Sequence, residues 1–129
     1  YYGTAIANAG PNTRLVVFSD DINFAKAKLN DFSDNIVFID GVITHADPSR
    51  RNRGEPQDQW DLFLMTLCNK HIIANSTFSW WGAFLANSEA IYYPSVWFGP
   101  DVDARDSRGI DVKESWVDAI PEDWKEVQC

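Results

Sequence analysis

The residues best suited to bind an anion stand together in one short segment. This segment consists of Asn75, Ser76, Thr77, Phe78 and Ser79, and it lies between an apolar run and a stretch with helical spacing. The first N–H groups of a helix lack partners within the helix, and the helix dipole favours negative charge there. Small hydroxylated side chains let a phosphate approach these groups. The segment therefore predicts a phosphate site, although ordinary helix capping by Ser or Thr explains the same residue types.

Two adjacent carboxylates, Asp20 and Asp21, follow a second apolar run at residues 15–19. Such a pair can bind a ribose hydroxyl, a metal ion or a loop amide. In the local alternative, Asp21 caps the next helix while Asp20 bonds a neighbouring turn. The residues alone leave both interpretations open.

A third acidic candidate, Asp61, comes three residues after Asp58 at the start of the segment with the strongest helical pattern. A carboxylate there complements the positive end of the helix dipole. A fixed carboxylate can also accept two N–H bonds from the edge of a guanine base. The helical pattern alone favours the first, local role.

The cationic cluster of the chain consists of Arg50, Arg51 and Arg53. These arginines can compensate the charge of a bound pyrophosphate, but a solvated loop explains them equally well. The chain as a whole has a net charge of −8 and a pI near 4.5. Nucleic-acid surfaces need a basic patch, so this balance argues against a nucleic-acid partner.

We predict no metal site. The pattern D-x-D of metal-dependent sugar transferases occurs at Asp101 and Asp103, but a match of three residues is common by chance. Neither His45 nor His71 has a metal-ligand partner at a useful spacing.

The elements that must position these residues alternate between strand and helix patterns. Hydrophobic residues make up 45% of the 129 positions and charged residues 23%, which excludes wholesale disorder. We expect strands at 15–19, 36–39, 71–75 and 90–93, helices at 22–29, 60–68 and 79–85, a loop at 44–57, and short helices within 114–127. This order predicts an α/β domain with a mostly parallel sheet, which binds ligands beyond the carboxyl ends of its strands.

Several of these segments resemble motifs of glycosyltransferase family 11, the α-1,2-fucosyltransferases. The family's F-S-D-D-I motif matches residues 18–22. A longer motif has the pattern D-x-x-L-M-x-x-C, followed by I-I-A-N-S-[ST]-F-S-W-W-G-A-x-L. It is matched by Asp61, Leu64, Met65 and Cys68 and by the continuous stretch 72–85. A P-x-x-W-F pattern follows at residues 94–98, so the resemblance covers residues 15–98.

The resemblance implies a Rossmann-like three-layer domain similar to the C-terminal half of a GT-B glycosyltransferase. It implies inverting, metal-independent transfer of fucose from GDP-fucose to a galactose 2-hydroxyl of a glycan acceptor, without a cofactor. In this interpretation Asp61 holds the guanine, and the pyrophosphate lies at Ser76, Thr77 and Ser79. The whole donor-binding set implied in this way is Asp20, Asp21, Asp61, Asn75, Ser76, Thr77, Phe78 and Ser79.

One family motif, H-x-R-R-G-D, is not reproduced in this chain. Arg50 and Arg51 lack the preceding His and come in the wrong order along the sequence. The family motif supplies an arginine that neutralises the leaving GDP, and it lies close to the proposed general base. We therefore expect residues 1–129 to form one nucleotide-sugar-binding domain, a fragment that needs an N-terminal half or a partner chain. We assign no catalytic residue.

Two other interpretations compete with a transferase domain. One is a non-catalytic module that binds a nucleotide or a glycan. The other is a receiver-type signalling domain, which Asp20 and Asp21 superficially resemble. A receiver needs an acceptor aspartate and a lysine at later strand ends, and the chain offers neither at a suitable place. No apolar run approaches the ~18 residues of a membrane span, so we expect a cytoplasmic or membrane-peripheral protein of bacterial type.

Overall fold

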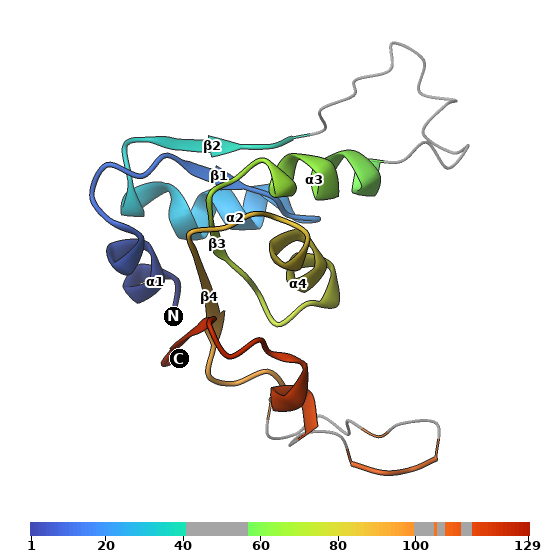
Figure 1. Cartoon of the computed structure of the whole chain (residues 1–129). Helices are drawn as coiled ribbons and strands as arrows, with labels where there is room; N and C mark the ends of the chain where they lie inside the picture. Colours follow the sequence, from blue (N-terminus) through green and yellow to red (C-terminus); the bar gives the residue numbers. More distant parts are fainter. Residues whose placement is uncertain (41–56, 100–104, 106–107, 112–114) are drawn as a thin grey trace, which may run out of the picture.

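The computed structural model describes residues 1–40, 57–99, 105, 108–111 and 115–129. In this part the chain forms, in order, α1 (Tyr2–Ala9), β1 (Leu15–Val17), α2 (Ile22–Leu29), the 3-10 helix η1 (Asn30–Phe32), β2 (Ile36–Phe38) and α3 (Gln57–Thr66). There follow β3 (Lys70–Ile72), α4 (Thr77–Phe84), β4 (Ala90–Pro94), the 3-10 helix η3 (Ser115–Ala119) and β5 (Lys125–Val127). Figure 1 shows their arrangement along the chain.

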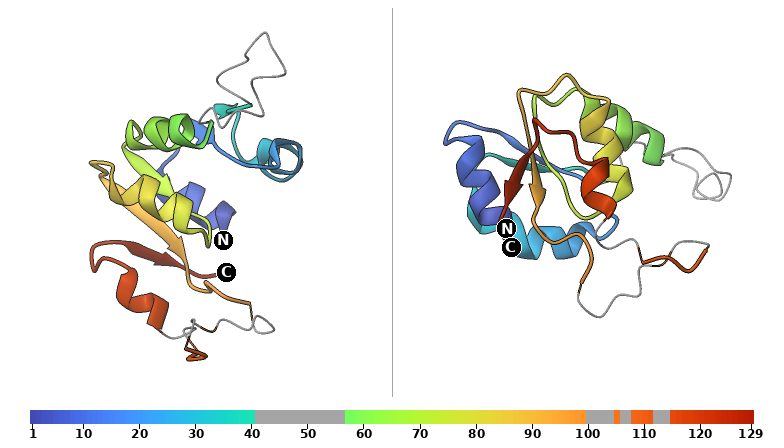
Figure 2. Two further views of the ribbon diagram at one scale, coloured as in Figure 1. Left: turned by 90° about the vertical axis from the view of Figure 1, so that its right-hand side faces the viewer. Right: turned by 60° about the horizontal axis from the view of Figure 1, so that its bottom comes forward.

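All strand pairs between these elements are parallel. β1 pairs with β2, with Leu15 opposite Ile36. β3, β4 and β5 form a second sheet in that order. Helices α1 and α2 lie on one side of the strands, and α3, α4 and η3 lie on the other (Figure 2). The predicted Rossmann-like α/β class with parallel strands is confirmed, although the hydrogen bonds join the strands into two sheets rather than one.

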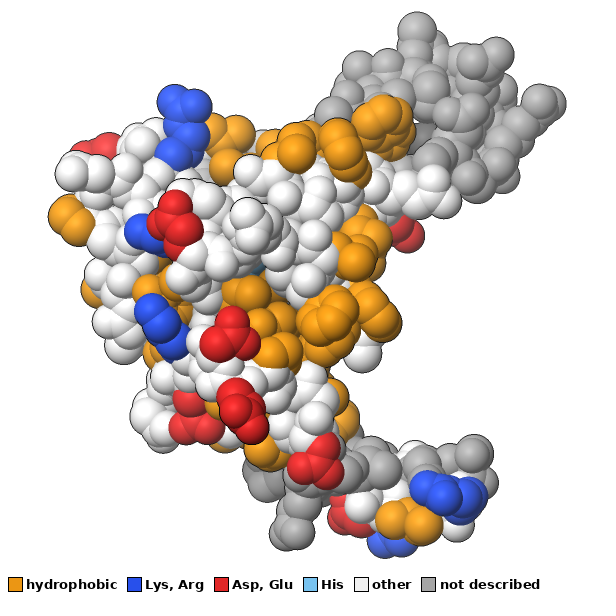
Figure 3. Space-filling view, in the orientation of Figure 1, with side chains coloured by type: hydrophobic (Ala, Val, Ile, Leu, Met, Phe, Trp, Pro, Cys, Tyr) orange, Lys and Arg blue, Asp and Glu red, His pale blue; other side chains and the backbone are white. Residues whose placement is uncertain are grey.

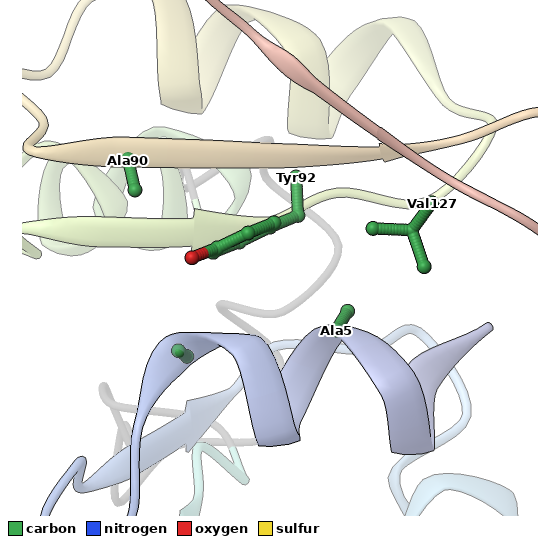
Figure 4. Close-up of a cluster of buried hydrophobic side chains, with 5 residues drawn as sticks. Ala5, Ala90, Tyr92 and Val127 are labelled. Carbon is green, nitrogen blue, oxygen red and sulfur yellow. The ribbon is translucent and has the colours of Figure 1, made fainter.

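The two faces of β4 explain where the core lies. Neighbouring side chains of a strand point to opposite faces, and a parallel strand covered by helices on both faces is apolar throughout. One cluster packs α1 against the sheet and contains Ala5, Ala9, Ala90, Tyr92 and Val127 (Figure 4). The cluster on the opposite face contains Ile73, Ala83, Ile91 and Trp124. The candidate site is therefore built on strands that are fixed from both sides.

Helices α3 and α4 approach each other closely because of Gly82. A methyl group added at Gly82 would stand 2.6 Å from Sδ and 3.1 Å from Cβ of Met65. A side chain at this position of α4 would therefore force Met65 to shift, and glycine avoids that cost. The glycine in the motif at residues 72–85 is therefore explained by the packing of α4 against α3.

The solvent side of α3 and α4 is rich in apolar side chains. Figure 3 shows apolar side chains gathered over these two helices. They include Trp60, Phe63 and Leu67 of α3 and its end, and Trp81, Phe84 and Leu85 of α4 and its end. Among the described residues, no helix combines the length and the apolarity that crossing a membrane requires.

The prediction for the C-terminal tail is partly wrong. One or two short helices were expected within residues 114–127, interrupted at Pro121, and η3 agrees with the first of them. After η3, however, the chain turns and forms β5, which pairs with Tyr92–Pro94 of β4. Pro121 ends the helical pattern, and Trp124 buries its ring beside Ile91 instead of continuing a helix. The helix α1 was not predicted, and α4 begins at Thr77, two residues before the predicted start at Ser79.

Candidate functional site

The N-terminal end of α4 is not capped by its own side chains. Ser76 is the N-cap residue, with the extended dihedrals φ −140° and ψ 130°, and its side chain makes no capping hydrogen bond. The Ser76 carbonyl accepts the N–H of Trp80 at 3.0 Å, which closes the first turn of the helix. Thr77 and Phe78 are exposed. The first N–H groups of α4 are therefore available to an anion from solvent.

The hydroxyl of Ser79 shapes the turn that leads into α4. Its Oγ lies 3.1 Å from the carbonyl oxygen of Ala74 and 3.0 Å from that of Ser76. The hydroxyl has one proton and donates it to one of these two carbonyl oxygens at a time. Its proton is therefore used in hydrogen bonds to the backbone that precedes α4. The predicted contact of Ser79 with a pyrophosphate would use an oxygen lone pair, and it stays a prediction.

The side chain of Asn75 joins two loops at the carboxyl ends of neighbouring strands. Its Nδ2 donates a hydrogen bond of 3.0 Å to the carbonyl oxygen of Trp97, which follows β4. The ring of Trp97 stacks on that of Trp116 in η3, with centroids 5.2 Å apart and planes 20° apart. From its sequence pattern, Trp116 was expected only to lie in a short helix within residues 114–127. No spacing signal in the sequence connects it with residues 75–79.

Asp20 and Asp21 take the local roles that the sequence left open. Asp21 Oδ1 accepts the N–H of Phe24 at 2.9 Å and so caps α2. The N–H of Asp21 lies 3.1 Å from both Asp20 Oδ1 and Ser19 Oγ. Among the described residues, no hydrogen bond or ion pair links this acidic pair to residues 75–79. A support role at the donor site therefore remains a prediction for these two carboxylates.

Asp61 lies one turn further into α3 than expected. The helix begins at Gln57, so the acidic residue of its first turn is Asp58. The end of the helix is complemented by Asp58, which weakens the capping interpretation for Asp61. Residues four apart share a helix face, so half-buried Asp61 lies on the same side as Met65, the side that meets α4 at Gly82.

The predicted cationic residues cannot be placed. Arg50, Arg51 and Arg53, together with the D-x-D pattern at 101–103, lie outside the described residues. In the described part, Lys26 pairs with Asp40 at 3.4 Å after β2, where both side chains are largely exposed. The same part of the chain contains no group of three His, Cys, Asp or Glu side chains that could hold a metal ion.

His71 is a structural residue away from this site. It is buried, and burial lowers the pKa of its imidazole despite the favourable hydrogen bond to Met65. The ring Nε2 lies 2.9 Å from the Met65 carbonyl oxygen, which can only accept, so Nε2 carries the proton. The ring Nδ1 then accepts the hydroxyl proton of Ser88 at 2.7 Å. The neutral ring links the end of α3 to the start of β4.

A groove of about 430 Å³ lies at the opposite edge, where strands begin. Its lining includes Gly10, Arg14 and Lys70. Lys70 Nζ donates to the Ala9 carbonyl at 2.8 Å, and Arg14 Nε donates to Asn35 at 3.1 Å. These cations are engaged by the protein itself. The carboxyl ends of the strands therefore offer the better site, because open helix N–H groups lie there.

Comparison with known proteins gives two kinds of match. Residues 5–118 match the sequence model described as glycosyl transferase family 11. A protein of Escherichia coli named alpha-1,2-colitosyltransferase is 37% identical over 92 residues, which are 67% of this chain and 27% of that protein. Another E. coli protein, the O-antigen biosynthesis glycosyltransferase WbnK, is 31% identical over 105 residues, 80% of this chain and 29% of that protein. The chain thus spans less than a third of either relative, and no solved structure matches it significantly.

Proposed function

Because the chain belongs to glycosyltransferase family 11, we propose that its part in glycosyl transfer is to bind the nucleotide-sugar donor. The observation that carries this proposal is the uncapped N-terminal end of α4, which follows β3 and opens to solvent at Thr77 and Phe78. The N–H groups there and the helix dipole attract a pyrophosphate without a lysine or arginine. This matters in a chain whose net charge is −8.

The proposed donor is GDP-fucose, with each end of the nucleotide held by a different helix. The pyrophosphate lies at Ser76 and Thr77, and Ser79 keeps the turn beneath it in shape through its bonds to backbone carbonyls. The guanine edge donates two N–H bonds to the carboxylate of Asp61. The packing of Gly82 on Met65 supports this arrangement, because it holds α3 and α4 at a short and fixed separation.

The proposed reaction is an inverting displacement. The 2-hydroxyl oxygen of a galactose in the acceptor glycan attacks the anomeric carbon of the fucosyl group from the side opposite GDP. The bond from that carbon to the phosphate oxygen breaks, and its electron pair leaves with GDP. The proton of the attacking 2-hydroxyl passes to a general base, to which we assign no residue among 1–129. Charge grows on the departing phosphate, so the N–H groups of α4 stabilise the transition state more than the bound donor. Arg50, Arg51 and Arg53 are proposed to add positive charge at the same place.

The names of the relatives support some details of this proposal more than others. The colitosyltransferase is named for an α-1,2 linkage, which supports a 2-hydroxyl as the acceptor group. Its name gives colitose rather than fucose as the transferred sugar, so the sugar is the least supported part. Both relatives are bacterial proteins, and we extend the proposal to a cytoplasmic or membrane-peripheral bacterial enzyme.

Calorimetric titration with GDP, GMP and ADP tests the donor site directly. We expect selective binding of GDP, because ADP lacks the guanine edge and GMP lacks the second phosphate. Asp61→Asn should weaken GDP binding at least tenfold, since one of two charge-assisted bonds is replaced by a repulsive amide contact. Asp58→Asn is the matched control, an exposed acidic residue of the same helix that should leave GDP affinity unchanged.

Two outcomes would contradict the proposal. Equal affinity for GDP and ADP would show that the protein makes no specific contact with guanine. It would favour a less specific nucleotide- or glycan-binding module. Absence of GDP binding by this chain in folded form would show that residues 1–129 do not form the donor site by themselves. Repeating the titration with the full-length relative named as a colitosyltransferase would then show whether the missing length supplies the site.

A further inference from the structure

The short helix η3 braces the start of α4 although it lies some 40 positions later in the sequence. The stack of Trp116 on Trp97 is one contact, and Tyr93 meets the edge of the Trp116 ring at 6.1 Å. A second tie runs from Trp80 in α4, whose Nε1 donates to the Ala119 carbonyl at 3.0 Å. These contacts place η3 against both the helix and the loop that follows β4.

Apart from the bond between Trp80 and Ala119, the Trp116 stack is connected to the α4 start through one hydrogen bond. The Trp97 carbonyl accepts from Asn75 Nδ2, and Asn75 immediately precedes the N-cap residue Ser76. Within the described residues, this is the only hydrogen bond between the loops 74–76 and 95–99. Asn75 is exposed, so water competes for its amide unless the Trp97 carbonyl is held still. The half-buried ring stack supplies that restraint.

We propose that Trp116 is a positioning residue for donor binding, acting through Trp97 and Asn75 on the turn that opens α4. The inference rests on the proposed function, because its ligand is the nucleoside diphosphate of the donor. Ser79 holds the carbonyl side of this turn, but no side chain caps its N–H groups. The ring stack adds a restraint on the direction of these N–H groups, on which anion affinity depends.

Hydrogen exchange measured without ligand tests the mechanical part of this inference. The reporter amides are those of Ser76 and Trp80, which bond the carbonyls of Ala74 and Ser76 at 2.8 and 3.0 Å. Trp116→Ala should raise their exchange rates about three- to tenfold, the range that corresponds to loss of one aromatic pair. Trp116→Phe keeps a flat ring and should restore most of the protection. The amide of Ile39, bonded to Val17 in the other sheet, should not change.

GDP titration tests the functional part. Trp116→Ala should weaken GDP binding by a similar factor of about three to ten, and Asn75→Leu should do the same by removing the donor of the link. The double variant should be no weaker than the worse single variant, because both changes break one chain of contacts. Trp60→Ala is the control, since Trp60 is 43% exposed on α3 and pairs only with Phe63 among the aromatic side chains of the described part.

The outcomes separate this inference from the proposed function. Unchanged exchange at Ser76 and Trp80 in Trp116→Ala would overturn the inference whatever the ligand result. Additive losses in the double variant would also overturn it, because Trp116 would then act on the donor independently of Asn75. Failure of the unmodified chain to bind GDP would refute the proposed function, and the exchange arm would still decide the positioning role. If Trp116→Ala does not fold, Trp116→Leu, which keeps an apolar side chain but lacks the stacking ring, carries the same tests together with Asn75→Leu.

Discussion

Replacing Gly82 by alanine should destabilise the protein, against the usual preference of helices for alanine. In an open helix the change from Gly to Ala stabilises by about 1 kcal/mol. At Gly82 the new methyl group would stand 2.6, 3.1 and 3.4 Å from Sδ, Cβ and Cγ of Met65. The first contact can be relieved by turning the flexible end of Met65. The contact with Cβ can be relieved only if α3 moves.

The net effect follows from these two terms. Overpacking of a closely packed contact costs about 1–3 kcal/mol. After the gain in helix propensity, we expect Gly82→Ala to lower the free energy of unfolding by up to about 2 kcal/mol. Because Asp61 lies one turn before Met65 on the same helix, displacement of α3 should also weaken GDP binding more than the stability loss alone explains.

Urea denaturation followed by fluorescence measures the effect, and a second glycine supplies the control. A methyl group on Gly3 of α1 would meet Phe32 Cε1 at 2.9 Å, but that ring is 49% exposed and can turn away. Gly3→Ala should therefore be neutral or slightly stabilising. Met65→Ala combined with Gly82→Ala should recover part of the loss, because the Sδ and Cγ contacts disappear. A Gly82→Ala variant as stable as Gly3→Ala would refute the proposed close packing of α3 and α4.

Three further predictions test the helix ends and the buried histidine. Asp21→Ala should lower the free energy of unfolding by about 1 kcal/mol, because it removes a formed cap. Ser76→Ala should change the free energy of unfolding by less than about 0.3 kcal/mol, because Ser76 makes no capping bond. Urea denaturation measures the free energy of unfolding of both variants. Ser76→Glu should abolish GDP binding in calorimetry with little loss of stability, since a carboxylate then competes for the N–H groups of α4. The pKa of His71 is lowered by burial, so the unfolded chain binds the proton more readily and stability should fall as the pH drops from 7 to about 5.5. His71→Gln should flatten this pH dependence of the denaturation midpoint, and an unchanged profile would contradict the assignment of a neutral buried ring.

Much of the architecture could be predicted from residue patterns because several strands are short, continuous apolar runs. The apolar runs that become β1, β2 and β4 are bounded by Asp, Asn or Pro, so they can be recognised as strands in the sequence. The α1 helix was missed because its buried face consists of the small residues Ala5 and Ala9, which give a weak apolar signal. Strand β5 was missed because only Val127 of its three residues is buried. Pairing with β4, a contact 30 positions away, decides its conformation.

Part of the candidate site could be predicted from the sequence, and part could not. The sequence predicted the anion-binding character of residues 75–79 from local chemistry alone, since a helix start after a strand carries its own N–H groups. It could not predict the link from Asn75 to Trp97 or the stack of Trp97 on Trp116, because these depend on how separate loops pack. A tryptophan at residue 116 has the same apolar signature whether it fills a core or holds a loop.

Two helix starts that look alike in the sequence, those of α2 and α4, differ in the structure. Both α2 and α4 follow a parallel strand and begin after a residue that favours the N-cap position. In α2 the cap is formed, because Asp21 accepts the N–H of Phe24, and its negative charge already occupies the place an anion would take. In α4 the cap is not formed, and Ser76 leaves the place uncharged and open. Electrostatics therefore selects α4 over α2 as the anion site, a choice that depends on side-chain geometry and not on residue type.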